Sequence, residues 1–377
     1  MRTGAIQLCT FLAALLLAAN YWHSTRLHAH RTPQAKPTTK SSPSPFIPSP
    51  HTVTPPPNPS PVISQQAQST VNDSIPLVVD VVMAADVGLL PGAAGLVRSA
   101  RANTAAELRF HLITPASDEA LARQTLRCLR VEGVQLYPLS ESWMNATLLP
   151  RIRVVADPAI TGHLDSPLNF ARFFLTSLLP PHLVASRARV LYLDADIIVH
   201  GDLQDLLSQM VTKRFAVAAV PRHEAHFRYS RYAKKCETVY MARYPGRPAF
   251  DASQETFNAG VVLIDLGEWQ NQRLTEEAVW WMERHVSDPN GGLWHLGSQP
   301  IMHLMLHGIW QALPDNWNLD GLGRLGHLPP KLLREAKLLH WTGRKKPWLL
   351  GGLHVEQYRR YVPDVVLRHC NRVIIRT

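Results

Sequence analysis

From residue 77 onwards, two patterns of apolar residues alternate along the chain. Short uninterrupted apolar runs are typical of buried strands, and apolar residues three to four positions apart are typical of helices. The runs predict strands over residues 77–83, 109–114, 134–139, 189–193, 216–220 and 260–266. The helical pattern covers a stretch near 93–101 and residues 118–129 and 168–179. Because strands and helices alternate, the pattern predicts crossover connections and a largely parallel sheet, which defines an α/β fold.

The N-terminal pattern is different. Residues 5–22 carry no charge, and their centre consists almost wholly of Leu and Ala. A run of this length suits a thin bilayer, and Tyr21 and Trp22 follow it where a membrane interface would hold them. These features favour a transmembrane signal anchor after a cytosolic tail (1–4), and a cleaved secretory signal stays open as the alternative. We therefore predict a single-pass type II protein of the Golgi or ER membrane, with the rest of the chain in the lumen.

Residues 23–76 contain twelve prolines and sixteen Ser or Thr residues but few aliphatic ones. Such a segment buries too little apolar area to offset the loss of chain entropy on folding. We therefore predict a disordered stem here and a single folded domain over residues 77–377. The tripeptides that begin at Asn72 and Asn145 match the acceptor pattern for N-glycosylation, so both asparagines are predicted glycosylation sites.

Composition and charge narrow the classes of function. The 377 residues are 46% hydrophobic, contain four cysteines and carry a formal net charge of +10, which excludes a small disulfide scaffold and a wholly disordered chain. The basic excess is concentrated in residues 213–250 and 324–348. Nucleic acid, an acidic membrane surface and an anionic small substrate could each explain it. Because the chain is predicted to enter the secretory pathway, we expect no nucleic-acid partner and favour an anionic substrate.

The segment with the clearest chemical meaning is Asp194-Ala195-Asp196, which directly follows the apolar run 189–193. Carboxylates two positions apart project to the same side of an extended backbone. Open α/β sheets bind ligands at the carboxyl ends of their strands. Two adjacent carboxylates repel unless a cation lies between them, and oxygen ligands select hard ions such as Mg²⁺ or Mn²⁺. The alternative is a pair of turn carboxylates that cap the following segment.

A second candidate segment lies far downstream, at residues 338–348. It holds His340 beside a tryptophan, then Gly343 and three consecutive basic residues that end at Lys346. His340 could complete a metal site with the two aspartates. Gly343 permits close backbone approach to a phosphate, and Lys346 could neutralise a diphosphate. The alternative is a basic surface loop with a packed His-Trp pair.

Six segments in a fixed order together resemble glycosyltransferase family 8, and within it the glycosyltransferase 8 domain-containing type II membrane proteins. The resemblance covers residue 77 to about residue 348. The segments are Ala84-Ala85-Asp86, 169–173, 191–202, 257–261, 297–300 and 340–348. The resemblance implies a glycosyltransferase A-type (Rossmann-like) domain with a mostly parallel central sheet. It implies retaining, Mn²⁺-dependent transfer of a sugar from a UDP-sugar to a glycan or glycoprotein acceptor, with Mg²⁺ as an alternative metal.

The resemblance also implies roles for individual residues. Asp194, Asp196 and His340 would hold the metal, and Arg172 and Gln299 would be the catalytic residues. The residues implied in binding the UDP-sugar are Ala84 and Asp86 at the uridine, Arg172, Asp194 and Ala195 at the ribose, sugar or phosphate, Asn258, Gly260 and Gln299 around the sugar, and Gly343 and Lys346 at the diphosphate.

One departure from the family pattern affects the chemistry. Many members carry an Asp-Gln pair where this chain has Ser298-Gln299. Because an amide is a poor nucleophile, a covalent sugar intermediate on Gln299 is not expected, and front-face attack assisted by the leaving phosphate is the hypothesis that suits this site. Trapping such an intermediate would contradict it. A homologue that binds nucleotide sugars with weak turnover and a phosphotransferase with a nucleophilic Asp are the alternative functions.

Cysteines and histidines outside these segments complete the sequence predictions. Cys128, Cys236 and Cys370 allow one disulfide and one remaining thiol, and the pairing is open. His303 and His307 have the spacing of a metal pair but lie in an apolar helical run, so we expect a packed or surface helix face instead of a metal site. The oligomeric state is also open, with a homodimer as one arrangement.

Overall fold

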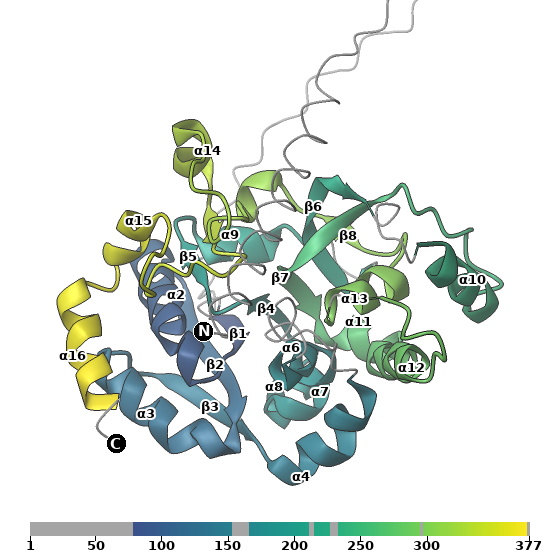
Figure 1. Ribbon diagram of the computed structural model, residues 1–377, viewed down its shortest axis with the longest axis horizontal. Helices are drawn as coiled ribbons and strands as arrows, with labels where there is room; N and C mark the ends of the chain where they lie inside the picture. The colour runs from purple at the N-terminus through teal and green to yellow at the C-terminus, as the bar shows by residue number, and fades with distance from the viewer. Residues whose placement is uncertain (1–77, 153–165, 211–214, 227–232, 295–296, 375–377) are drawn as a thin grey trace, which may run out of the picture. The chain divides into compact units, whose positions relative to one another are not determined.

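A seven-stranded sheet with strand order β3-β2-β1-β4-β7-β6-β8 lies at the centre of the computed structural model (Figure 1). The structure describes residues 78–374 except 153–165, 211–214, 227–232 and 295–296. Every pairing in the sheet is parallel except those of β7, which runs antiparallel to β4 and β6. The predicted α/β fold with a mostly parallel sheet is therefore confirmed. The strands are β1 (Val78–Ala84), β2 (Glu107–Pro115), β3 (Val134–Leu139), β4 (Arg189–Leu193), β6 (Val217–His226), β7 (Glu255–Asp265) and β8 (Gln311–Ala312).

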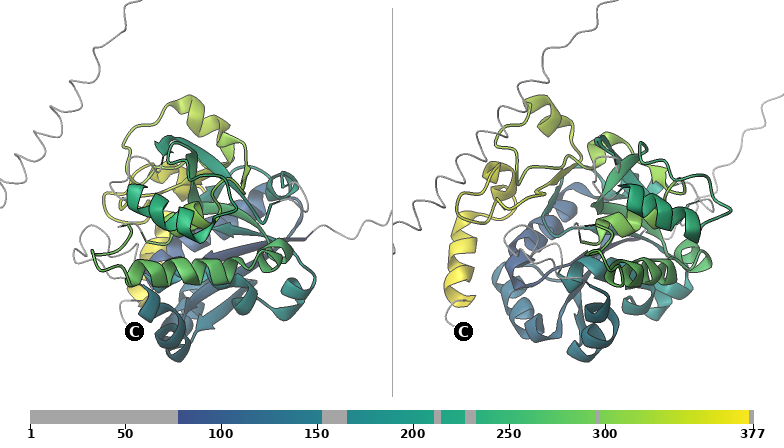
Figure 2. Two further views of the ribbon diagram at one scale, coloured as in Figure 1. Left: turned by 90° about the vertical axis from the view of Figure 1, so that its right-hand side faces the viewer. Right: turned by 45° about the vertical axis from the view of Figure 1, so that its right-hand side comes forward.

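Helices cover both faces of this sheet (Figure 2). Successive residues of a strand point to opposite faces, so that Val81 and Met83 enter one hydrophobic core and Val82 enters the other. The α-helices are α2 (Leu90–Asn103), α3 (Glu119–Cys128), α4 (Glu141–Trp143), α6 (Pro167–Ala171), α7 (Leu175–Leu178), α8 (Pro181–Ala185), α9 (Leu203–Ser208), α10 (Ala233–Arg243), α11 (Leu266–Asn271), α12 (Leu274–Val286), α13 (Gln299–Met305), α14 (Pro330–Glu335), α15 (Val355–Arg359) and α16 (Asp364–Ile374). Short turns of other helix types are η1 (Val87–Leu89), η2 (Ala116–Asp118), η3 (Met144–Leu148), η4 (Leu149–Arg151), η5 (Arg172–Phe174) and η7 (Asp315–Trp317).

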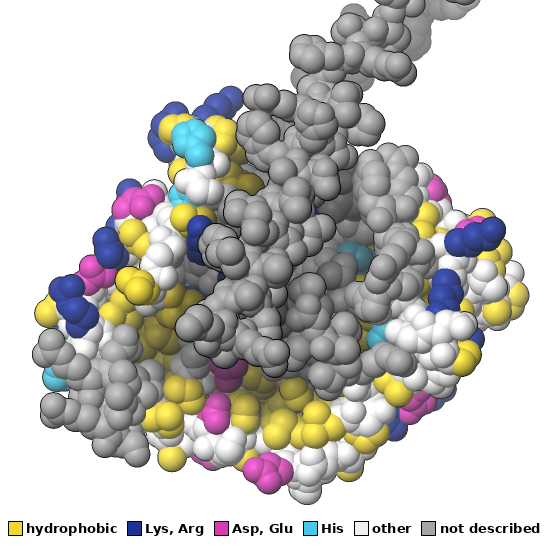
Figure 3. Space-filling model, in the orientation of Figure 1, with side chains coloured by type: hydrophobic (Ala, Val, Ile, Leu, Met, Phe, Trp, Pro, Cys, Tyr) yellow, Lys and Arg dark blue, Asp and Glu magenta, His cyan; other side chains and the backbone are white. Residues whose placement is uncertain are grey.

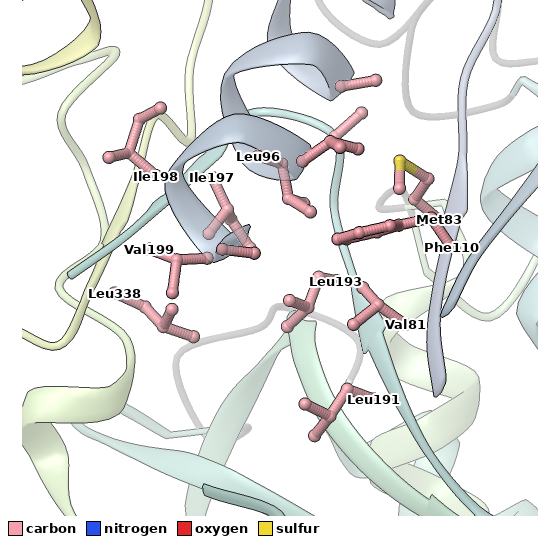
Figure 4. Close-up of a cluster of buried hydrophobic side chains, with 14 of the residues drawn as sticks. Val81, Met83, Leu96, Phe110, Leu191, Leu193, Ile197, Ile198, Val199 and Leu338 are labelled. Carbon is pink, nitrogen blue, oxygen red and sulfur yellow. The ribbon is translucent and has the colours of Figure 1, made fainter. Parts of the chain in front are cut away.

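A separate two-stranded sheet joins β5 (Ile197–Val199) to β9 (Leu338–His340) in antiparallel register. Ile197 is the direct partner of His340, although the two residues lie far apart in the sequence. Leu191 and Leu193 of β4 and Ile197 and Val199 of β5 are buried in the same core (Figure 4). This small sheet therefore carries the downstream segment to the end of β4.

Most predicted elements appear where the apolar pattern placed them, but the predicted helix over 168–179 is divided. It consists of α6, the 3₁₀ turn η5 and α7. All three residues of η5, Arg172, Phe173 and Phe174, are buried. Because three consecutive residues point in different directions around such a turn, η5 is enclosed by the fold on every side rather than on one face.

The open cysteine pairing is resolved. Cys128, the last residue of α3, forms a disulfide with Cys370 in α16. Cys236 is free and buried, and its Sγ donates to the Leu293 carbonyl oxygen at 3.4 Å. Burial raises the pKa of the Cys236 thiol to about 12, so this cysteine is unreactive at neutral pH.

The predicted membrane location requires correction. Among the residues that the structure describes, no helix is long and apolar enough to cross a membrane. The longest of them, α2, has 14 residues, or about 21 Å against a hydrocarbon layer of about 30 Å. This finding overturns the prediction of a single-pass type II protein of the Golgi or ER membrane, which we do not retain. The predicted tail, apolar segment and stem, and Asn72 with them, lie outside the described residues, whereas Asn145 is exposed in η3.

Candidate active site

The Asp194-Ala195-Asp196 segment forms the turn between β4 and β5. The apolar residues on either side of it are buried in the core, which leaves the two carboxylates at the carboxyl end of β4 (Figure 4). The turn is fixed at both ends, because Asp194 N donates to Gly260 O at 2.8 Å and Trp341 N donates to Asp196 O at 3.0 Å. Its position is that of a ligand site in an open α/β sheet.

His340 lies against both carboxylates because β9 pairs with β5. Its Nε2 is 3.3 Å from Asp196 Oδ1 and 3.7 Å from Asp194 Oδ2. The three side chains offer ligand atoms that all lie within 4.8 Å of one another. Its Nδ1 is 3.0 Å from Asn318 Oδ1, so Nδ1 carries the proton and Nε2 faces the carboxylates. The structure thus brings together the three residues predicted from the sequence to hold a metal.

Gly260 forms one wall of this cluster. It lies in a stretch of β7 that bulges away from β6, where the register shifts between Ala219 and Pro221. A Cβ atom at Gly260 would collide with the Asp194 carboxylate and with the His340 ring. The backbone is held in this bulge by a bond from Gly260 N to Asn258 Oδ1 at 2.7 Å. Two carboxylates and one imidazole with ligand atoms within 4.8 Å of one another are a donor set that fits a divalent metal ion.

Arg172 is the first of two cations that contact the acidic pair. Its guanidinium donates to Asp194 Oδ1 at 3.2 Å and to the carbonyl oxygens of Asn169 and Ala259, and it lies 4.6 Å from the centre of the Tyr192 ring. Burial lowers the pKa of Arg172, but Tyr192 and Asp194 raise it by more. Arg172 is therefore a buried permanent cation, and η5 is the turn that holds it inward.

Lys346 is the second cation. Its Nζ contacts Asp196 Oδ2 and donates to Trp341 O at 2.8 Å. Burial raises the pKa of Asp196, but the electrostatic attraction of its neighbours His340 and Lys346 outweighs burial and holds that pKa below its usual range. Asp196 is therefore ionised at neutral pH, as a metal ligand must be.

Ala84 and Asp86 lie at the same edge of the sheet. Strand β1 ends at Ala84 and pairs with β4 in parallel register, with Val82 opposite Tyr192. Asp86 caps the turn η1, and its Oδ1 accepts from Leu89 N at 3.2 Å. The register therefore places the end of β1 beside the end of β4, where Asp194 lies.

Gln299 and Asn258 lie next to Ala259 of β7, the residue that Arg172 also contacts. Gln299 is the first residue of α13, and its Oε1 accepts from Ala259 N at 3.3 Å. Both polar backbone groups of Ala259 are thus bound, since Arg172 donates to its carbonyl oxygen. Asn258 and Ser298 are both buried. These contacts join Arg172 and Gln299 through a single residue of β7.

Gly343 has a φ of +116°, a conformation that residues with side chains rarely adopt. A Cβ there would meet Gly323 O at 2.6 Å, so the glycine lets two loops approach closely. The bond from Lys345 N to Gly323 O, at 3.1 Å, joins the same loops. Gly343 and Lys346 therefore lie on a fixed loop next to the acidic pair.

Two further residues, Asn318 and Trp348, support the site. Asn318 binds the imidazole of His340 and has no local motif around it. Trp348 packs against Gly92 of α2 at a point where a Cβ would also approach Ala195 O. Trp348 belongs to the segment 340–348 of the family resemblance, whereas only the tertiary contacts identify Asn318.

His303 and His307 do not form a metal pair. His303 Nε2 donates to Phe257 O at 2.8 Å, and His307 Nε2 accepts from Asp251 N at 3.0 Å. Burial lowers the pKa of His303 to about 4, so it is neutral at physiological pH. Both histidines are partly buried and hydrogen-bonded to the backbone, which agrees with the expected packed or surface helix face.

Comparisons with known proteins match this fold and site. A family model described as Glycosyl transferase family 8 matches residues 80–350. Mouse glycosyltransferase 8 domain-containing protein 2 is 27% identical over 326 residues, which are 80% of this chain and 86% of that protein. Probable galacturonosyltransferase 10 of Arabidopsis thaliana is 27% identical over 292 residues, which are 70% of this chain and 51% of that protein. The crystal structure of galactosyltransferase LgtC with donor and acceptor sugar analogues has a TM-score of 0.54 at 18% identity and covers 76% of this chain and 96% of that one.

The central sheet and the acidic edge of β4 are those of a glycosyltransferase with a GT-A-like α/β fold. The chain belongs to glycosyltransferase family 8, because the family model spans most of its length. The resemblance inferred from the sequence is thus confirmed, and the chain is an enzyme that transfers sugars. Family membership excludes the alternative of a phosphotransferase with a nucleophilic Asp.

Proposed function

We propose that this chain transfers a sugar from a UDP-sugar to a glycan or glycoprotein acceptor, with retention of the anomeric configuration and with Mn²⁺ as its metal. Residues 77–377 are the catalytic domain in this proposal. The observation that carries it is the cluster of Asp194, Asp196 and His340 at the carboxyl edge of the sheet, with its ligand atoms within 4.8 Å of one another. Mg²⁺ suits the two carboxylates as well, and the imidazole favours Mn²⁺.

Each residue of the cluster and its surroundings has a role in the proposal. Asp194, Asp196 and His340 hold the metal, which supplies Lewis-acid stabilisation of the diphosphate as it departs. Lys346, already held by Trp341 O, adds a fixed positive charge to the same leaving group, and Gly343 lets the backbone approach it.

The remaining residues bind and orient the donor. Ala84 and Asp86 contact the uridine, and Ala195 and Arg172 contact the ribose or the phosphate. Asn258, Gly260 and Gln299 surround the transferred sugar. These assignments are supported by position: the end of β1 lies beside the end of β4, and Arg172 and Gln299 bind the carbonyl oxygen and the N–H of the same residue, Ala259.

Ser298 and Gln299 offer no carboxylate nucleophile, so they suit a reaction that retains the anomeric configuration without a covalent sugar intermediate. The acceptor hydroxyl attacks the anomeric carbon on the face from which the diphosphate leaves. Its proton passes to the departing phosphate oxygen, so that the new C–O bond forms as the C–O bond to phosphate breaks. Gln299 orients the sugar with its amide, which is itself fixed by Ala259 N.

The test is release of UDP from a panel of UDP-sugars with and without Mn²⁺. We expect Asp196→Ala and His340→Ala to abolish metal-dependent release, because each removes one ligand. The matched control is Asp265→Ala, since Asp265 is a partly buried carboxylate paired with Arg189 at 3.6 Å at the opposite end of β4. This control should keep metal-dependent release. Wild-type activity in both Asp196→Ala and His340→Ala would refute the assigned metal site.

A further inference from the structure

A largely buried ion pair connects the main sheet to the chain beside the metal cluster. Arg222 of β6 donates Nε to Asp320 Oδ2 at 2.7 Å, and its terminal NH2 nitrogen contacts the same oxygen. The side chains are 26% and 19% exposed, so solvent screens the pair less than it screens a surface ion pair. Neither residue belongs to the segments that carry the family resemblance.

Asp320 lies in residues 318–322, which we call the support segment because they hold His340. Leu319 N donates to Leu338 O at 3.0 Å, and His340 N donates to Leu319 O at 2.9 Å. Leu322 N then donates to His340 O at 3.2 Å. Since Asn318 also binds the imidazole, the support segment holds both the backbone and the ring of His340.

We propose that Arg222 is a positioning residue for His340, which it holds in place through Asp320 and the support segment. The inference rests on the proposed function, because it concerns the metal site of the proposed transferase. Arg222 acts from the main sheet, where β6 is hydrogen-bonded to β7, the strand that carries Gly260. The ion pair therefore sets the position of His340 relative to the wall of the metal cluster.

Loss of Arg222 has a defined structural consequence. In the described part of the chain, Asp320 keeps one other ion-pair partner, Arg324, whose NH2 lies 3.5 Å from Asp320 Oδ1 and whose side chain is 54% exposed. Asp320 would turn outward to this arginine and draw the support segment away from β6. His340 would then lose its fixed orientation, and groups that orient a metal-binding histidine typically change metal affinity by about 10- to 100-fold.

The experiment measures Mn²⁺ binding to the nucleotide-free full chain by electron paramagnetic resonance. We expect Arg222→Ala to raise the Kd for Mn²⁺ about tenfold and Asn318→Ala to raise it at least as much. The double variant Arg222→Ala/Asp320→Ala should bind Mn²⁺ no more weakly than Arg222→Ala, because the two side chains act through one bond. Arg222→Lys keeps a charge for Asp320 and should recover part of the affinity.

The matched control is Arg243→Ala. Arg243 pairs with Glu277 at 2.6 Å, with side chains 33% and 18% exposed, but joins α10 to α12. It should lower the melting temperature about as much as Arg222→Ala does and leave the Kd for Mn²⁺ unchanged. A wild-type Kd in Arg222→Ala, or an equal loss of affinity in Arg243→Ala, overturns the inference alone. If Asp196→Ala binds Mn²⁺ as tightly as the wild type, the proposed metal site fails, and the inference fails with it.

Discussion

At the scale of single residues, the site depends on the absence of a side chain as much as on the charged groups. Gly260 lies between Asp194 and His340, and an added methyl group would meet both. The His340 ring cannot yield easily, because it is buried and bonded to Asn318. The glycine therefore preserves the space between the predicted metal ligands, a role that its backbone conformation alone does not reveal.

We expect Gly260→Ala to lower metal-dependent UDP release about 100-fold, since displacement of a reacting group by about 1 Å can cost this much. The measurement is the rate of UDP release as a function of Mn²⁺ concentration. Gly246→Ala is the matched control, because a Cβ at Gly246 meets no atom within 4 Å, and it should behave as the wild type. An active Gly260→Ala variant with unchanged Mn²⁺ dependence would contradict this account of the cluster.

At the scale of elements, the disulfide ties the C-terminal helix to the part of the chain that precedes β3. Cys128 ends α3, and Cys370 lies in α16, 242 residues further along the chain. Closing so long a loop removes much freedom from the unfolded chain, and such bonds typically contribute about 2–4 kcal/mol. We expect Cys128→Ser/Cys370→Ser to melt at a lower temperature than the wild type in a calorimetric scan.

Reduction provides the control for this prediction. Dithiothreitol should lower the melting temperature of the wild type and of Cys236→Ser, because both keep the disulfide. It should leave Cys128→Ser/Cys370→Ser unchanged. If the wild type and the double variant melt at the same temperature without reductant, α16 is held by packing alone and the disulfide contributes nothing measurable.

The elements also show how far the sequence could predict this structure. Strands β1 and β4 follow from largely apolar runs, because a strand buried on both faces admits few polar residues, whereas β2 and β3 also contain polar residues and exposed positions. The acidic turn after β4 was also predictable, because its two carboxylates directly follow an apolar run. The break of 168–179 at η5 was not, since it depends on Arg172 reaching Asp194 and Ala259, which lie elsewhere in the chain.

The contacts that hold His340 cannot be predicted from local sequence patterns, for a related reason. The pairing of β5 with β9 and the bond from Asn318 join residues that nothing in their spacing connects. Family resemblance could indicate His340, but neither Asn318 nor the Arg222–Asp320 pair has a signal in a single sequence. Such bonds exist only once two sheets have been brought together, so they are properties of the packed fold.

At the scale of the whole molecule, several of the basic side chains behind the net charge of +10 are paired with carboxylates. In the described part of residues 213–250, Arg222, Lys235 and Arg243 are each paired with a carboxylate. On the face drawn in Figure 3, Lys and Arg side chains gather over α14, which belongs to the second basic segment. Among the described residues, the Lys and Arg side chains that contact Asp194 and Asp196 are Arg172 and Lys346, so two placed charges, rather than a basic surface, mark the site for an anionic donor.

This arrangement predicts that metal and nucleotide stabilise the protein together. UDP and Mn²⁺ should raise the melting temperature by more than the sum of their separate effects, because the proposed diphosphate site and metal site adjoin at Asp196 and Lys346. A ligand at 100 times its Kd adds about 2.7 kcal/mol to the stability of the native state. Differential scanning fluorimetry of the wild type and of Asp196→Ala measures this, with Asp265→Ala as the control that keeps the joint effect. An undiminished joint effect in Asp196→Ala contradicts the shared site, whereas joint stabilisation without UDP release from any UDP-sugar would show that a chain with Ser298 binds its donor but has lost turnover.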